Sequence, residues 1–137
     1  MENTESHALK NIFTGKKILA AEDVEINREI LGKMLEETGI SIDFAENGKI
    51  ALKTIDENPE KYELFLTDIH MPEMDGYETA RRIRGLDRGE KIPIIAMTAN
   101  VFREDIEKCL SAGMNDHIGK PVEIEELIRK LKKYLSR

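Results

Sequence analysis

The feature that most constrains the fold is a regular alternation of short apolar segments with longer segments of helical period. Four short segments are apolar or alternating, which is typical of strands in a covered sheet: 17–21, 41–45, 62–67 and 92–97. Between and after them, apolar residues recur at helical spacing. A short fifth strand near 116–118 completes a β-α unit repeated five times. This order predicts an α/β fold, a doubly wound parallel sheet of five strands with helices on both faces.

Two helical segments carry clear apolar stripes, and their ends carry turn residues. The first stripe consists of Ile26, Ile30, Leu31, Met34 and Leu35, and the last of Ile124, Leu127, Ile128, Leu131 and Leu135. Each stripe predicts a helix face that packs on the sheet. The segment ends are marked by Gly39, Gly85 and Gly113, and glycine suits a left-handed residue just past the last helical turn. Asp75 and Glu78 have the spacing of a capping box at a helix start.

Length and charge limit the classes of protein to which the chain can belong. The 137 residues fit one domain, which we place at 16–137, while the polar residues 1–15 are expected to be a leader or linker remnant. The net charge of -6 argues against direct nucleic-acid contact. No apolar run approaches membrane-spanning length and no secretory signal is present, so we expect a cytoplasmic domain without membrane contact. Cys109 shares a helical stripe with Phe102, Ile106 and Leu110, which predicts a buried structural thiol.

Chemically useful residues follow the predicted strands. Glu22 and Asp23 follow the first strand, Asp68 the third, Thr98 the fourth and Lys120 the fifth. In parallel α/β sheets, the reactive site lies at the carboxyl ends of the strands, so we expect these side chains to meet. Three converging carboxylates repel one another without a cation, and Mg²⁺ prefers oxygen ligands and joins carboxylates to phosphate oxygens. With a lysine and a hydroxyl nearby, the set predicts transfer of a phosphoryl group to an Asp nucleophile.

Each of these residues also has an ordinary structural interpretation. The Glu22-Asp23 pair could merely favour the start of a helix through its dipole, and Asp68 could simply form a turn. Thr98 and Lys120 could be a cap and a solvated surface charge. Only their arrival from four separate strand ends favours a common site.

The same residues lie within motifs that resemble a known family, the receiver domains of bacterial response regulators and hybrid histidine kinases. The resemblance runs from Lys16 to Leu135 and is strongest towards the receivers of hybrid kinases. Its motifs are Ala21-Glu22-Asp23 with Asn27-Arg28, Ala45-Glu46-Asn47-Gly48 with Ala51-Leu52, TDIHMPEMDG at 67–76, Ala96-Met97-Thr98-Ala99-Asn100, and Gly119-Lys120-Pro121. The resemblance implies a flavodoxin-like sheet with strand order 2-1-3-4-5.

The resemblance also implies roles for the acidic residues. Asp68 would be the phosphoacceptor and would ligate Mg²⁺ together with Asp23, while Glu22 would act through water. The backbone carbonyl of His70 would be a further ligand, and Mn²⁺ is an alternative ion. We interpret the His70 side chain as an outward-facing residue that tunes access to the site, with a His-Asp-Asp transition-metal site as the alternative.

Further roles concern the phosphoryl group and the switch. Thr98, Ala99 and Lys120 would hold the phosphoryl oxygens, and the bond from Lys120 to Pro121 would be cis. Receivers usually carry Tyr or Phe three residues before the lysine, where the ring reports the state of the Thr, but this chain has His117. Either the switch runs through Thr98 and the backbone alone, or neutral His117 rotates inward and makes activation pH-dependent.

The resulting functional prediction is phosphorelay signalling. Asp68 would take a phosphoryl group from the phosphohistidine of a sensor histidine kinase or a histidine phosphotransfer domain, with a homodimer as a further assembly. The response would reach the face built from the fourth helix (about 101–111) and the fifth strand and helix. The isolated domain would then not be an enzyme in the ordinary sense, although its parent chain could be a hybrid histidine kinase.

Two other functions stay open at this point. One is a phosphatase of the haloacid dehalogenase type, but such enzymes place a second Asp two residues after the nucleophile, and this chain has His70 there, so the general acid is missing. The other is a receiver-like binding module that is never phosphorylated. The presence of every acidic, Thr and Lys position speaks against it.

Overall fold

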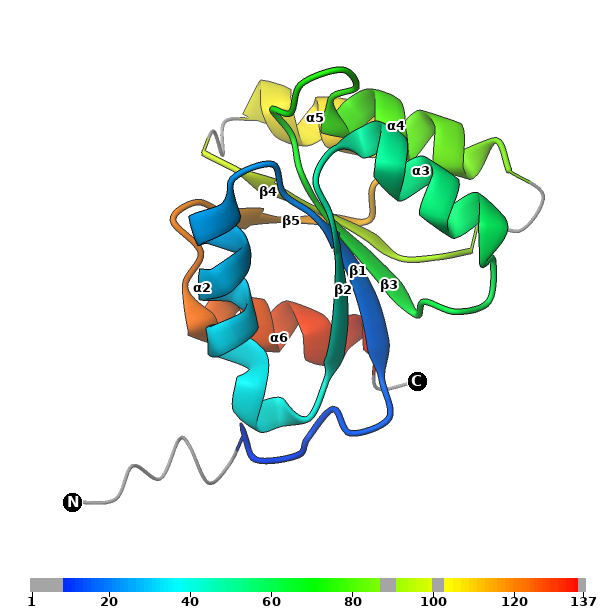
Figure 1. The fold of residues 1–137 in the computed structure, drawn as a ribbon. Coiled ribbons are helices and arrows are strands. Elements are labelled where there is room, and N and C mark those ends of the chain that lie inside the picture. Colours follow the sequence, from blue (N-terminus) through cyan, green and yellow to red (C-terminus); the bar gives the residue numbers. More distant parts are fainter. Residues whose placement is uncertain (1–8, 87–90, 100–102, 136–137) are drawn as a thin grey trace.

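The computed structural model describes residues 9–86, 91–99 and 103–135, and it has one sheet between two layers of helices (Figure 1). In chain order, the elements are β1 (Lys17–Ala21), α2 (Glu25–Leu35), η1 (Glu36–Thr38), β2 (Ser41–Ala45), α3 (Gly48–Glu57), β3 (Leu64–Asp68), α4 (Gly76–Arg84), β4 (Ile94–Thr98), α5 (Arg103–Ser111), β5 (Asp116–Gly119) and α6 (Ile124–Leu135). All strand pairs are parallel, and the order is β2-β1-β3-β4-β5. The predicted fold class and strand order are therefore confirmed.

Both faces of the sheet are covered, which explains why its central strands are almost entirely apolar. Successive side chains of a strand point to opposite faces. Leu19 and Ala21 of β1 pack with helices α3, α4 and α5, whereas Ile18 and Ala20 pack with α2 and α6 on the other face. Both apolar clusters leave the carboxyl ends of the strands free for polar residues.

Two predicted strands begin too early in the sequence. Strand β3 starts at Leu64 and β4 at Ile94, each two residues later than the predicted segments 62–67 and 92–97. Pro93 has no N–H to donate to a ladder, although its carbonyl accepts the Phe65 N–H at 2.9 Å. Both strands also end one residue later than predicted, so Asp68 and Thr98 are the last residues of their strands rather than the residues that follow them.

The boundary predicted at residue 15 stays a prediction, and some residues before it contact the domain. Residues 1–8 lie outside the described part of the chain, but residues 9–15 pack on the domain. Phe13 is 2% exposed and belongs to the core beneath α2 and α6. The N–H groups of Asn11 and Phe13 donate to the Glu37 and Thr38 carbonyls at 2.7 and 2.8 Å, which satisfies carbonyls that a helix end leaves unpaired. The leader was predicted because a single aromatic residue carries no periodicity.

The end of α6 also packs close to the residues that precede a strand. Near the end of α6, the Tyr134 hydroxyl donates to the Asn115 carbonyl at 3.2 Å. Asn115 lies directly before β5, as Glu37 and Thr38 lie shortly before β2. Both contacts therefore lie at the amino-terminal ends of strands, opposite to the carboxyl ends.

The predicted apolar stripes are buried only in part. In α2, Leu31 and Leu35 are buried, but Ile26 and Ile30 are 57% and 45% exposed. Ile30 lies about 100° around the helix from Leu31, so it faces away from the sheet. In α6, only Ile124 of the predicted stripe is exposed, at 37%. Among the described residues, no helix combines the length and apolar character needed to cross a bilayer.

The turn residues and the thiol behave mostly as expected. Gly39 and Gly113 have φ values of 78° and 95°, but Gly85 has φ -80° and so is not left-handed. Asp75 caps α4, since its Oδ1 accepts the Glu78 N–H at 2.8 Å.

Cys109 is buried, and burial raises the pKa of its thiol. Of its predicted stripe, Leu110 is exposed and Phe102 lies outside the described residues.

Candidate functional site

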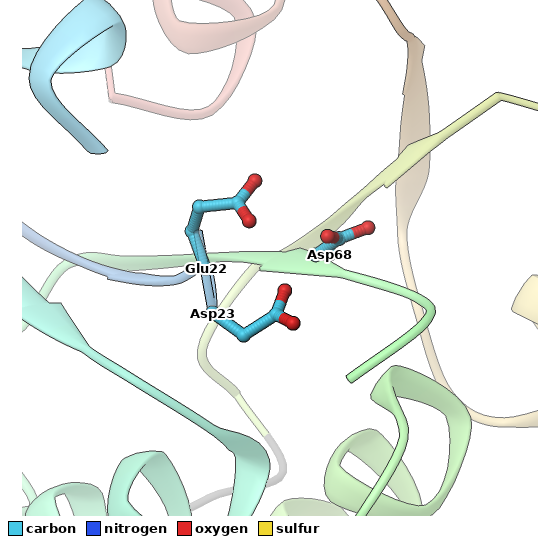
Figure 2. Close-up of side chains that lie close together, drawn as sticks. All are labelled: Glu22, Asp23 and Asp68. Atoms are coloured by element: carbon cyan, nitrogen blue, oxygen red, sulfur yellow. The ribbon is translucent and has the colours of Figure 1, made fainter. Parts of the chain in front are cut away.

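Three carboxylates meet at the carboxyl ends of neighbouring strands. Glu22 and Asp23 follow β1 directly, and Asp68 ends β3, which pairs with β1. Each residue offers an oxygen, and these oxygens all lie within 4.8 Å of one another. Figure 2 shows the three side chains directed towards a common space. Glu22 is fully buried and Asp68 is 7% exposed, so water alone does little to offset their repulsion.

The side chain of Lys120 bridges two of these carboxylates. Its Nζ lies 3.1 Å from Glu22 Oε1 and 3.0 Å from Asp68 Oδ2. Lys120 follows β5, at the far edge of the sheet from β1 and β3, and its long side chain spans this distance. The predicted meeting of the lysine with the acidic residues is therefore present in the structure.

Electrostatics at the site leave negative charge uncompensated. Burial raises the pKa of the Asp68 carboxyl above its ordinary value, and the bond from Lys120 offsets this only in part. Burial acts in the same direction on Glu22, but the Val24 N–H and Lys120 outweigh it and hold the pKa of Glu22 below its ordinary value. The Lys120 pKa is raised, because its bonds to Asp68 and Glu22 outweigh burial. One ammonium faces three carboxylates, which suits an additional hard cation with oxygen ligands.

Thr98 lies beside this cluster at the end of β4. It is 4% exposed and pairs in register with Gly119 of β5. Its carbonyl accepts the Lys120 N–H at 2.9 Å, so Thr98 and Lys120 are joined through the backbone. Ala99 follows it and is exposed, which leaves its position open to a ligand, whereas Asn100 lies outside the described residues.

The loop after Asp68 is folded back tightly. The Gly76 N–H donates to the Ile69 carbonyl at 2.7 Å. A Cβ on Gly76 would lie 2.4 Å from the Asp68 carbonyl oxygen, so only glycine fits there. The His70 side chain is exposed on this loop, and the cluster that could hold a metal ion among the described residues consists of the three carboxylates without His70. The geometry therefore supports a carboxylate site over a His-Asp-Asp site.

His117 has an intermediate position. Its side chain is 26% exposed, and its Nδ1 lies 3.9 Å from Asp116 Oδ1. In the sheet it pairs in register with Ala96. This position agrees with a partly exposed residue of β5, and both switch mechanisms stay predictions. The peptide bond between Lys120 and Pro121 is cis.

Sequence reasoning did not identify two charged residues that hold the loops of the site. Arg28 Nη1 donates to the Glu22 carbonyl at 2.8 Å and so fixes the acidic loop. Glu126 Oε1 accepts the Gly119 N–H at 3.1 Å, directly before Lys120. Both act on main-chain atoms, and such contacts leave no periodic signal in a sequence. Arg28 was noted only within a motif, and its place one turn into α2 was the single available hint.

Comparison with known proteins places the chain among signalling domains. A family model described as the response regulator receiver domain matches residues 18–132. The hybrid signal transduction histidine kinase L of Dictyostelium discoideum is 42% identical over 122 residues, which cover 86% of this chain. The chain spans 7% of the length of that kinase and 15% of the length of a probable histidine kinase 1 of Oryza sativa.

Solved structures agree with these sequence matches. The receiver domain of a sensor histidine kinase from Pseudomonas aeruginosa, with a magnesium ion in its active site cleft, has a TM-score of 0.82 and 35% identity, covering 90% of this chain and 100% of that one. The receiver domain of Ssk1 from Saccharomyces cerevisiae, in complex with the histidine phosphotransfer protein Ypd1, has a TM-score of 0.81 and 32% identity, with coverages of 89% and 90%.

Proposed function

The chain belongs to the response regulator receiver domain family, and we propose that it accepts a phosphoryl group on Asp68 from a phosphohistidine donor in a two-component phosphorelay. The observation that carries this proposal is the position of Asp68. Its buried carboxylate lies 3.0 Å from Lys120 Nζ and within the cluster formed with Glu22 and Asp23. Three strand ends, those of β1, β3 and β5, thus supply a nucleophile, a cation and two further acidic ligands to one place.

The proposed reaction is an in-line displacement at phosphorus. An oxygen of the Asp68 carboxylate forms the new bond to phosphorus. The bond from phosphorus to the donor imidazole nitrogen breaks, and its electron pair stays on that nitrogen. Lys120 moves from the free carboxylate to a phosphoryl oxygen and so continues to neutralise charge. The Thr98 hydroxyl and the Ala99 N–H donate to the other phosphoryl oxygens.

The donor set fits Mg²⁺, because carboxylate and carbonyl oxygens are its usual protein ligands. We propose that Asp23, Asp68 and the His70 carbonyl would hold it directly and Glu22 through water, with Mn²⁺ as an alternative ion. When bound, the ion would supply positive charge to the carboxylates and the phosphoryl oxygens. The magnesium ion in the cleft of the similar Pseudomonas aeruginosa receiver supports this choice.

The proposed output is a change of surface. Thr98 ends β4, next in the sheet to β5, and a bond from its hydroxyl to the phosphoryl group would draw it towards Asp68. The change would reach the face built from α5, β5 and α6. His117 lies within that face, and whether it rotates with Thr98 stays a prediction.

The proposed partner is a histidine kinase or a histidine phosphotransfer protein. The complex of the similar Ssk1 receiver with Ypd1 supports the second. We further propose that residues 16–137 act as acceptor rather than as a turnover enzyme, within a parent that could be a hybrid kinase. The predicted homodimer, the absence of nucleic-acid and membrane contact and the cytoplasmic location stay predictions. A haloacid dehalogenase-type phosphatase is not favoured, because exposed His70 stands where such an enzyme needs a second Asp.

The test is intact-mass spectrometry after incubation with acetyl phosphate and Mg²⁺. We expect one phosphoryl adduct on the parent, none on Asp68→Asn, and an unchanged adduct on Asp56→Asn, a matched change at an exposed position of α3. An Asp68→Asn variant modified as fully as the parent would show that the phosphoacceptor is assigned wrongly.

A further inference from the structure

Within the described part of the chain, strand β5 lies at the edge of the sheet and pairs only with β4. In a parallel strand, N–H groups that point to the neighbour alternate with groups that point away, and at an edge the second kind has no ladder partner. The N–H of Lys120 points to β4 and donates to the Thr98 carbonyl at 2.9 Å. The N–H of Gly119 donates instead to Glu126 Oε1 at 3.1 Å.

These two bonds hold consecutive residues from opposite sides. One anchor is the backbone of β4, and the other is a half-buried side chain in the first turn of α6. Gly119 has no side chain to restrict its dihedral angles, so without the second anchor the residue before Lys120 gains freedom. The position of the Lys120 backbone sets where its Nζ arrives, and that atom must reach both Glu22 and Asp68.

We propose that Glu126 is a positioning residue for Lys120. By accepting the Gly119 N–H, its carboxylate fixes the start of the β5–α6 loop, so that the lysine side chain extends across the sheet edge to Asp68. This inference rests on the proposed function, because it assigns Glu126 a role in phosphoryl transfer. Glu126 itself touches neither the nucleophile nor the phosphoryl group.

If Glu126 only stabilised the start of α6 by its charge, Glu125→Ala and Glu126→Ala would have the same effect. Glu125 and Glu126 both lie in the first turn of α6, where a negative charge stabilises a helix through its dipole. Glu125→Ala removes the same charge from the same turn but leaves the bond to Gly119 intact. Glu126→Gln removes the charge and keeps an oxygen that can accept the bond. Glu126→Ala removes both.

The first measurement is the rate at which Asp68 is phosphorylated by acetyl phosphate at saturating Mg²⁺. The temperature is chosen below the unfolding transitions of all variants. We expect Glu126→Ala to be roughly 10-fold slower than the parent, since small misplacements of a reacting group are costly in rate. Glu126→Gln and Glu125→Ala should stay close to the parent rate. Equal rates for Glu126→Ala and Glu125→Ala, or a Glu126→Gln variant as slow as Glu126→Ala, would overturn the proposal.

The second measurement needs no phosphorylation and separates the two possible failures. Hydrogen exchange of the Gly119 amide, followed by NMR, should be slow in the parent and in Glu126→Gln and fast in Glu126→Ala. Similar exchange in all three chains would refute the anchor even if the parent is phosphorylated normally. A parent that takes up no phosphate on Asp68 would instead refute the proposed function, while the exchange rates would still report on the bond to Gly119.

Discussion

Replacing Lys120 by Met removes the ammonium that bridges Glu22 and Asp68 and keeps a side chain of similar length. We expect the variant to be less stable than the parent in metal-free buffer near neutral pH, because two buried carboxylates lose their shared cation. The matched control is Lys33→Met, at an exposed position of α2. It changes the net charge equally without touching the site.

The expected loss follows from the burial of the three side chains. Removing one member of a buried ion pair costs about 3–5 kcal/mol. The side chain of Lys120 is 24% exposed, while those of Glu22 and Asp68 are 1% and 10% exposed. Solvent therefore reaches the ammonium more easily than the carboxylates that remain. We expect the lower end, about 3 kcal/mol, which for a domain of this size lowers Tm by roughly 10 °C.

The pH dependence gives a sharper criterion. The pKa of Glu22 is lowered in the folded state, so its stabilisation is present above the ordinary value of 4.5 and is lost as pH falls through the folded value. The pKa of Lys120 is raised, so its stabilisation is present below 10.5 and is lost as pH rises through the folded value. Loss of Lys120 also raises the pKa of Asp68 further, because Lys120 lowers it in the parent. The stability difference between parent and Lys120→Met should thus be full near neutral pH and shrink towards both acid and alkaline pH.

The assay is thermal unfolding followed by circular dichroism across this pH range, without metal and then with added Mg²⁺. Mg²⁺ should raise the Tm of the Lys120→Met variant more than that of the parent, because a bound cation compensates the repulsion between the carboxylates that have lost Lys120. The reasoning is refuted if Lys120→Met and Lys33→Met have the same Tm near neutral pH, or if their difference does not depend on pH.

Four further substitutions test other parts of the structure. Thr98→Ala should still take up a phosphoryl group but lose much of the amide chemical-shift response of α5, β5 and α6 to a phosphoryl mimic; an unaltered response would contradict the proposed switch. Gly76→Ala, whose Cβ would lie 2.4 Å from a main-chain oxygen, should lose about 3 kcal/mol in urea unfolding, whereas Gly32→Ala, whose Cβ would meet nothing within 4 Å, should gain up to about 1 kcal/mol. Asp116 has a pKa below the ordinary 3.8, because bonds from Lys130 and others outweigh burial, so Asp116→Asn should lose about 2 kcal/mol at neutral pH and the difference from the parent should vanish in acid denaturation as pH falls below that value.

The sheet could be predicted from the sequence because its strands are buried on both faces and carry nearly continuous apolar runs. The ends of those runs are less well defined by hydrophobicity. Tyr62 and Ile92 are apolar enough to extend the predicted strands, but the strands begin two residues later. Likewise, Ile26 and Ile30 fit the helical stripe of α2 yet lie outside its buried face.

The acidic and lysine positions of the site could be predicted because each stands beside a strand end. The side chains that aim them could not. Arg28 and Glu126 reach main-chain atoms of neighbouring loops, and the sequence alone does not show which of many exposed charges makes such a bond. Phe13 was missed for a similar reason, since one aromatic residue in a polar segment has no pattern until its contacts are known.

The contacts made by residues 9–15 and by the end of α6 also determine how the domain can be tethered. Both segments are fastened beside Glu37, Thr38 and Asn115, where strands begin, whereas Asp68 lies where a strand ends. A linker, a tag or a solid support joined near either segment would be attached near the amino-terminal ends of the strands, opposite to the acidic cluster (Figure 1). Attachment at either segment therefore starts away from Asp68, so we expect an immobilised domain to keep its acidic cluster accessible to the proposed phosphohistidine donor.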